Sequence, residues 1–188
     1  GAARDFDNPQ FADAVGGGFL APPPTWLLRP LVPRTQPFEL SVKTPGSAFV
    51  SGLAPRADGT FAASLADLSQ APYSAFGPFT PYVVEIGDAR VNVVRVGPEP
   101  GVGDAPVFEW VARAAGDIAA FLGEFPQKHT LVLVVIGGGQ SIANGSALGN
   151  GGASVIVHVG ADVQPAKRNI WRSAARRARM SRNWPGGS

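Results

Sequence analysis

The sequence contains no cysteine, and only two of its residues are histidines. A disulfide framework and a thiolate zinc site both require cysteine, so neither can form. Imidazole ligands are limited to His129 and His158, which do not have the spacing of a metal-binding pair. Cysteine usage leaves the redox environment open, and the sequence indicates no particular localisation.

Long apolar runs are also absent. The longest, residues 131–136, has six residues, whereas a membrane-spanning helix needs about 20. No basic and then apolar leader precedes Pro9, so we expect any signal peptide to be absent or already removed. Because 45% of the residues are hydrophobic, we expect a soluble, folded chain without a transmembrane segment.

Glycine and proline are abundant instead. The 24 glycines and 18 prolines form roughly a fifth of the chain, above the usual share of about 12%, so helix cannot dominate. Charge is distributed unevenly: residues 1–165 carry nine basic and fourteen acidic side chains, and residues 166–188 carry seven basic ones and no acidic one. The net charge of +2 therefore arises from a basic tail.

The first half of the chain has the pattern of short strands. Residues 1–37, with three consecutive glycines and many prolines, predict an irregular lead-in. Residues 38–100 alternate apolar and polar positions between turns and predict a small antiparallel β domain. Its clearest feature is a hairpin of residues 81–86 and 89–96 joined by Gly87 and Asp88, which suit a two-residue turn.

The pattern then becomes helical. Apolar residues recur every three or four positions from Val107 to Leu122, with Asp104 as expected N-cap and Gly123 as terminator. We expect a strand at 130–136, a glycine-rich loop at 137–152 and a strand at 154–159. Since the strand at 130–136 is continuously apolar, both its faces should be covered.

Four short segments resemble bacterial gluzincin metallopeptidases of the glycyl-aminopeptidase-like kind. The resemblance extends from about residue 47 to 160 and rests on SAFVSGL at 47–53, APYSAFG at 71–77, FLGEFP at 121–126 and GNGGASVIV at 149–157. It implies an α+β fold, in which an N-terminal antiparallel β domain precedes one amphipathic helix and the first strands of a thermolysin-like mixed sheet. Residues 101–165 would then be an incomplete catalytic domain, and residues 166–188 a separate basic tail.

In that family a helix bearing H-E-x-x-H follows soon after the glycine-rich strand, and its histidines bind zinc while its glutamate activates water. Residues 169–180 read NIWRSAARRARM instead, and neither His nor Glu occurs after His158. The resemblance therefore implies a zinc-dependent aminopeptidase as parent, whereas we expect no catalytic residue, metal ligand or cofactor in this chain. Whether it is an enzyme stays open.

Three explanations for the tail remain. A reading-frame change or truncation would replace the catalytic helix. A genuine basic helix would place Trp171, Ala174, Ala175 and Ala178 on one face. The third explanation is a disordered arm. An unfinished domain should also leave an apolar face uncovered, so we expect self-association unless the tail packs there.

The resemblance supports a substrate-binding edge at Asn150, Gly151, Gly152 and Ala153, because glycine lets a peptide backbone approach closely. A flexible connector without ligand is the alternative interpretation. A different function class is a non-catalytic module that binds nucleic acid or an anionic membrane surface through Arg176, Arg177, Arg179 and Arg182. Such arginines are more often simply solvated. No G-x-S-x-G or complete dinucleotide-binding fingerprint is present.

Overall fold

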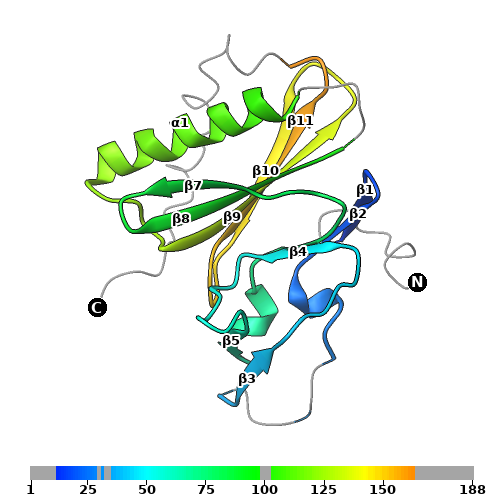
Figure 1. Ribbon diagram of the computed structural model, residues 1–188, viewed down its shortest axis with the longest axis vertical. Helices are drawn as coiled ribbons and strands as arrows, with labels where there is room; N and C mark the ends of the chain where they lie inside the picture. The colour runs from blue at the N-terminus through cyan, green and yellow to red at the C-terminus, as the bar shows by residue number, and fades with distance from the viewer. Residues whose placement is uncertain (1–11, 29–30, 32–34, 98–102, 164–188) are drawn as a thin grey trace.

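The computed structural model describes residues 12–28, 31, 35–97 and 103–163, and within these ranges the chain has an α+β fold (Figure 1). The described residues contain one α-helix and eleven strands, and these strands form sheets of five, four and two strands. The α+β class predicted from the sequence is confirmed. None of the helices in these ranges is long and apolar enough to cross a membrane.

The five-stranded sheet is mixed and has the order β10-β11-β9-β8-β7. Its strands are β7 (Tyr82–Ile86), β8 (Ala89–Val96), β9 (His129–Gly137), β10 (Ile142–Leu148) and β11 (Ser154–Gly160). The three inner strands are parallel, and both edge strands run antiparallel to their neighbours. The predicted hairpin is confirmed as β7 and β8, with Gly87 at a φ of +60° in the turn.

This hairpin corrects one feature of the predicted division. The sequence assigned residues 82–96 to the N-terminal β domain at 38–100, but β8 pairs with β9 along its length. The sequence could not indicate this pairing, because the helix separates the two strands in the chain. The hairpin therefore belongs to the sheet that follows the helix, and the four-part division itself stays a prediction.

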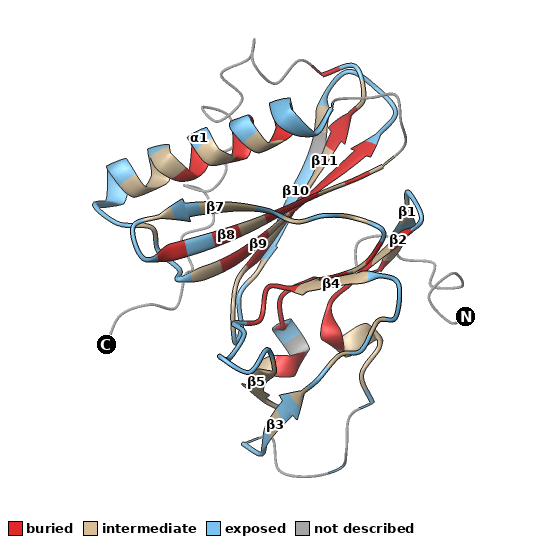
Figure 2. Cartoon of the chain, in the orientation of Figure 1, coloured by how far each residue is buried: buried red, intermediate tan, exposed pale blue. Residues whose placement is uncertain are grey.

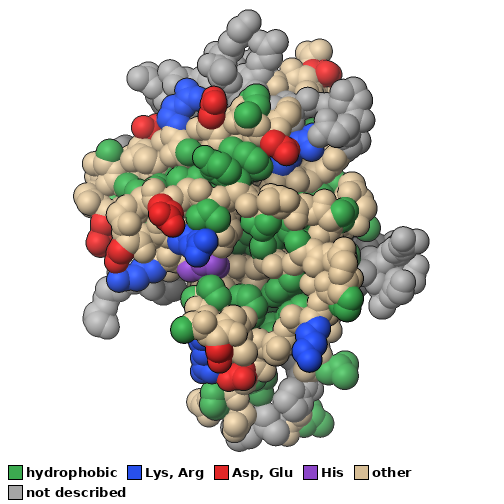
Figure 3. Space-filling model, in the orientation of Figure 1, with side chains coloured by type: hydrophobic (Ala, Val, Ile, Leu, Met, Phe, Trp, Pro, Cys, Tyr) green, Lys and Arg blue, Asp and Glu red, His purple; other side chains and the backbone are tan. Residues whose placement is uncertain are grey.

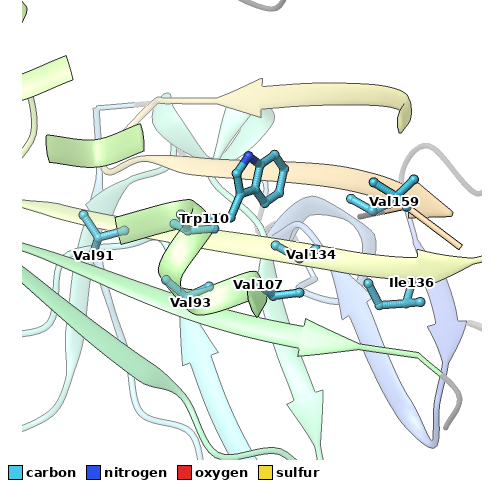
Figure 4. Close-up of a cluster of buried hydrophobic side chains, with 9 residues drawn as sticks. Val91, Val93, Val107, Trp110, Val134, Ile136 and Val159 are labelled. Carbon is cyan, nitrogen blue, oxygen red and sulfur yellow. The ribbon is translucent and has the colours of Figure 1, made fainter. Parts of the chain in front are cut away.

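The helix α1 (Asp104–Leu122) connects β8 to the parallel strand β9. Its buried side packs on the sheet in a cluster that includes Val107, Trp110, Val93 and Val134 (Figure 4). It ends at Gly123, whose φ of +88° supplies the left-handed conformation predicted for the terminator. Asp104 was expected to be the N-cap, but it is the first helical residue.

The N-cap is Gly103, and it makes no side-chain cap hydrogen bond. The Asp104 carboxylate lies 3.6 Å from Arg95 Nε instead. An acidic group in the first turn also interacts favourably with the helix dipole, so Asp104 stabilises this end from one position later than predicted.

A four-stranded antiparallel sheet lies against the other face of the five-stranded sheet, in the order β1-β2-β6-β4. Its strands are β1 (Asp13–Val15), β2 (Gly18–Ala21), β4 (Ala48–Ser51) and β6 (Ser74–Gly77). β3 (Pro37–Leu40) and β5 (Phe61–Ser64) form the small third sheet, and the 3-10 helices are Pro23–Thr25 and Asp67–Gln70.

The predicted irregular lead-in at residues 1–37 is wrong for residues 13–21. Gly16 and Gly17 have φ angles of +57° and +77° and form the turn between β1 and β2. Leu20 and Ala21 are fully buried. The glycines that suggested irregular chain are thus hairpin residues, and this segment contributes to the core.

The central strand β9 is buried on both faces. On one side, Val134 and Ile136 pack under α1. On the other, Leu131 and Leu133 join Leu20 and other residues of the four-stranded sheet in a second cluster. Buried positions accordingly follow β8 and β9 through the centre of the molecule (Figure 2). The prediction that both faces of this strand are covered is confirmed.

Candidate functional site at the β10 edge and its hairpin

The hairpin between β10 and β11 contains the four residues predicted to bind substrate, and the chain itself uses most of their backbone groups. The Asn150 N–H donates to Gln70 O at 3.3 Å, and the Ala153 N–H donates to Gly52 O at 3.0 Å. The Ala153 carbonyl accepts from Leu131 N at 2.9 Å. Gly152 forms an isolated antiparallel bridge with Leu53. The hairpin therefore joins the five-stranded sheet to the segment that follows β4.

Close packing at this junction explains why glycine, which has no Cβ atom, occupies these positions. A Cβ atom on Gly152 would collide with Gly52 O and lie 2.9 Å from Leu53 Cα. A Cβ atom on Gly52 would lie 2.5 Å from Ala153 O. Gly151 has a φ of +73°, which L side chains rarely adopt. The close backbone approach expected from these glycines occurs, but Gly52 of the same chain makes it. A substrate role for these four residues stays a prediction.

Buried hydroxyl groups hold the junction from within. Ser154 Oγ accepts a hydrogen bond from Tyr73 N at 2.8 Å, and Gly52 N donates to Tyr73 O at 2.9 Å. Ser51 and Ser74, also buried, are linked through their hydroxyl groups at 3.0 Å. Burial raises the pKa of the Tyr73 phenol above its usual value. These contacts fix β4, β6 and β11 relative to one another and leave this part of the hairpin rigid.

The neighbouring strand β10 was not predicted. Residues 137–152 were expected to form one loop, but Ile142–Leu148 pairs with β11. Gly145 and Ala147, like Asn144 and Ser146, are exposed. β10 is an edge strand and pairs on its outer side with no strand of the described ranges. The chain therefore presents a strand edge next to the predicted substrate hairpin.

The register indicates which groups point outward from this edge. Gly160 N donates to Ser141 O on the β10 side, whereas Ala153 O accepts from Leu131 on the β9 side. Backbone groups alternate sides along a strand, so Ile156 and His158 direct their N–H and C=O groups toward β10. Their partners are Ser146 and Asn144. The backbone N–H and C=O groups of Gly145 and Ala147 therefore point away from the sheet.

The two histidines lie far apart. His129 begins β9, and its Nε2 lies 2.9 Å from Ser51 O. His158 lies on β11 opposite Val135, six residues further along β9 than His129. At about 3.3 Å per residue this separates them by about 20 Å. Both are half-buried strand residues, and they cannot share one ion with Zn–N bonds of about 2.1 Å.

No group of three or more His, Asp or Glu residues able to hold a metal ion occurs among the residues that the structure describes. The alternative site, formed by Arg176, Arg177, Arg179 and Arg182, lies outside the described residues. Nucleic-acid or membrane-surface binding through these arginines stays a prediction. Binding to DNA that weakens steeply with salt would support it.

No protein-family model and no curated protein matches the sequence. The fold is similar to the crystal structure of an aminopeptidase N family protein from Idiomarina loihiensis, with a TM-score of 0.63 and 14% sequence identity. The alignment covers 80% of this chain and 26% of that chain, so this chain spans about a quarter of the solved protein's length. At this identity the similarity concerns the fold alone, that is, the arrangement of the helix and the sheets.

Proposed function

We propose that this chain is part of a peptidase-like protein and binds an extended peptide along β10. The supporting observation is the outward direction of the backbone groups of Gly145 and Ala147 on an exposed edge strand. The similar fold in an aminopeptidase N family protein supports a peptidase-like parent. The sequence resemblance supports the finer assignment to zinc-dependent aminopeptidases of the gluzincin kind.

A peptide bound in this way would add a sixth strand to the sheet. Each residue with outward backbone groups offers one donor and one acceptor, so Gly145 and Ala147 together provide about four hydrogen bonds. The net contribution of each hydrogen bond is only about 0.5–1.5 kcal/mol, because the groups give up hydrogen bonds to water. Association itself also costs free energy. We therefore expect weak binding with little dependence on peptide sequence.

Replacement of Ala147 by proline tests this binding mode. Proline removes the outward N–H but no hydrogen bond to β11, and edge strands tolerate it. We expect at least about a tenfold weaker affinity, equivalent to about 1.4 kcal/mol, for pentaalanine with a free amino terminus, measured by titration with NMR detection. The control Ala147→Val retains the N–H and should bind nearly as the original chain does. Equal affinity of both variants would show that the edge is not the binding site.

Binding without turnover is the second part of the proposal. The sequence contains no H-E-x-x-H motif, and its two histidines lie too far apart to share a zinc ion. We expect purified protein to contain no stoichiometric zinc by elemental analysis. It should also leave alanine and glycine p-nitroanilides uncleaved with and without added zinc. One tightly bound zinc ion per chain, or cleavage that a chelator abolishes, would contradict this part.

A further inference from the structure

The strand β7 forms the other edge of the five-stranded sheet, and its register indicates which backbone groups are unpaired. Arg90 N on β8 donates to the carbonyl of the residue before β9, so Arg90 faces β9 and the next residue, Val91, faces β7. Val91 pairs with Val84. The N–H and C=O groups of Val83 and Glu85 therefore point away from the sheet. No strand of the described ranges pairs with them.

The surface beside this edge is apolar. Tyr82 on β7 is 43% exposed, and its ring stacks on Phe108 of α1 with the ring centroids 4.6 Å apart. Leu122, at the end of α1, is 54% exposed. Figure 3 shows apolar side chains on the surface around α1 and β7. Exposed apolar surface next to unpaired strand groups is typical of a contact with another chain.

The side of α1 toward the β7 edge carries no charged residue from Phe108 onward. Phe108 marks this side through its contact with Tyr82. Further residues share the side at helical spacing, and they are Ala112, Ala115, Ala119 and Leu122. The charged residues of the same stretch lie elsewhere around the helix, and they are Glu109, Arg113 and Asp117. Small uncharged side chains allow another helix to approach this side closely.

We propose that a second copy of this chain pairs with β7, so that the two five-stranded sheets join into one sheet around a twofold axis. Antiparallel pairing centred on Val84 would place Val83 opposite Glu85 of the second copy. Twofold symmetry then creates the same pair again on the other side of the axis. The four outward residues, two from each copy, would form about four main-chain hydrogen bonds.

The position of α1 fits this arrangement. α1 lies mainly over β7 and β8 (Figure 1). Strands lie about 4.8 Å apart, so the axis of α1 would be about 4.8 Å from the twofold axis and about 10 Å from the axis of the second α1. Packed helices lie about 8–10 Å apart. The uncharged sides of the two helices would therefore contact each other above the joined strands.

Charge and position favour β7 over β10 for this contact. Glu85 is the charged residue of β7, and it lies opposite Arg90 on β8. Cross-strand pairs of opposite charge are favourable, so Glu85 is compensated within its own copy. β10 lies at the far edge of the sheet from α1, so pairing there would add no contact between helices.

Sedimentation velocity of the full chain tests the proposal. We expect the mass to rise from that of one chain, 19.4 kDa, toward that of two as the concentration increases. Ala112→Glu would place a charge between the two helices and should raise the dissociation constant at least about tenfold. The control Ala120→Glu adds the same charge on an exposed side of α1 away from β7 and should leave the dissociation constant unchanged. Circular dichroism should show that both variants are folded.

Cross-linking tests the register of the two strands. The chain contains no cysteine, so Val84→Cys introduces a single thiol. This thiol would lie beside its own copy at the twofold axis, and we expect oxidation with copper phenanthroline to give a disulfide-linked dimer. Tyr82→Cys should give none, because Tyr82 would lie opposite Ile86 of the second copy.

Three results would overturn the proposal. The first is the mass of one chain at every concentration. The second is a series of ever larger species, which is expected when β7 pairs with β10 of another copy and the contact does not close. The third is a dimer that Ala147→Pro weakens and Ala112→Glu does not, which would assign the contact to β10. A chain that never dimerises would leave the peptide proposal intact, because pentaalanine binding is measured separately by titration.

Discussion

Replacement of Leu133 by alanine is expected to lower the free energy of unfolding by about 2–5 kcal/mol. Leu133 is 0% exposed and lies in the cluster between the five-stranded and four-stranded sheets. Both sheets would lose contacts, because a cavity at this position has fixed β-structure on two sides and little freedom to collapse. Chemical denaturation followed by circular dichroism measures the change.

The control for this variant is Leu28→Ala, which removes the same atoms from a side chain that is 97% exposed. Its effect should stay within about 0.5 kcal/mol. Similar effects of the two substitutions would mean that the two sheets do not share a core. A lower free energy of unfolding in the Leu133 variant alone would support the face-to-face packing of the two sheets.

Replacement of Gly152 by alanine should destabilise the chain by about 1–3 kcal/mol or more, as overpacking does. The added methyl group would collide with Gly52 O, so the bridge between Gly152 and Leu53 must open. The hydrogen bond from Ala153 N to Gly52 O should weaken with it. We therefore expect faster hydrogen exchange at the Ala153 amide as well as a lower midpoint of denaturation.

Gly138→Ala is the matched control for the junction. A Cβ atom there meets no atom within 4 Å. Stability should be unchanged or slightly higher, because alanine reduces the entropy of the unfolded chain. If Gly152→Ala were as stable as this control, the close packing of the two backbones at the junction would be refuted. The glycine would then be free for a ligand, as the sequence first suggested.

Local sequence signals predicted the elements that depend on local contacts. The β7–β8 hairpin follows from Gly87 and Asp88, and the end of α1 follows from Gly123. The continuous apolar run at 131–136 predicted a strand buried on both faces. In each case a turn residue or an apolar period within a few residues determines the structure, so no distant partner had to be known.

The elements that were missed depend on distant partners. β10 has the sequence IANGSAL, whose Asn-Gly pair and few β-branched residues indicate a turn, and pairing with β11 overrides that preference. β1 and β2 are joined by a turn of two glycines, Gly16 and Gly17, and their position in the sheet depends on the pairing of β2 with β6. For the candidate site, the sequence predicted close backbone approach at Gly152 but could not identify Gly52 as the partner.

Hydrogen exchange at the β10 amides tests the proposed peptide site most directly. At a pentaalanine concentration that saturates the chemical-shift changes, exchange should slow at Gly145 and Ala147. It should change little at Asn144 and Ser146, whose backbone groups already face β11. Unchanged exchange at Gly145 and Ala147, with protection at Asn150–Ala153 instead, would contradict the account.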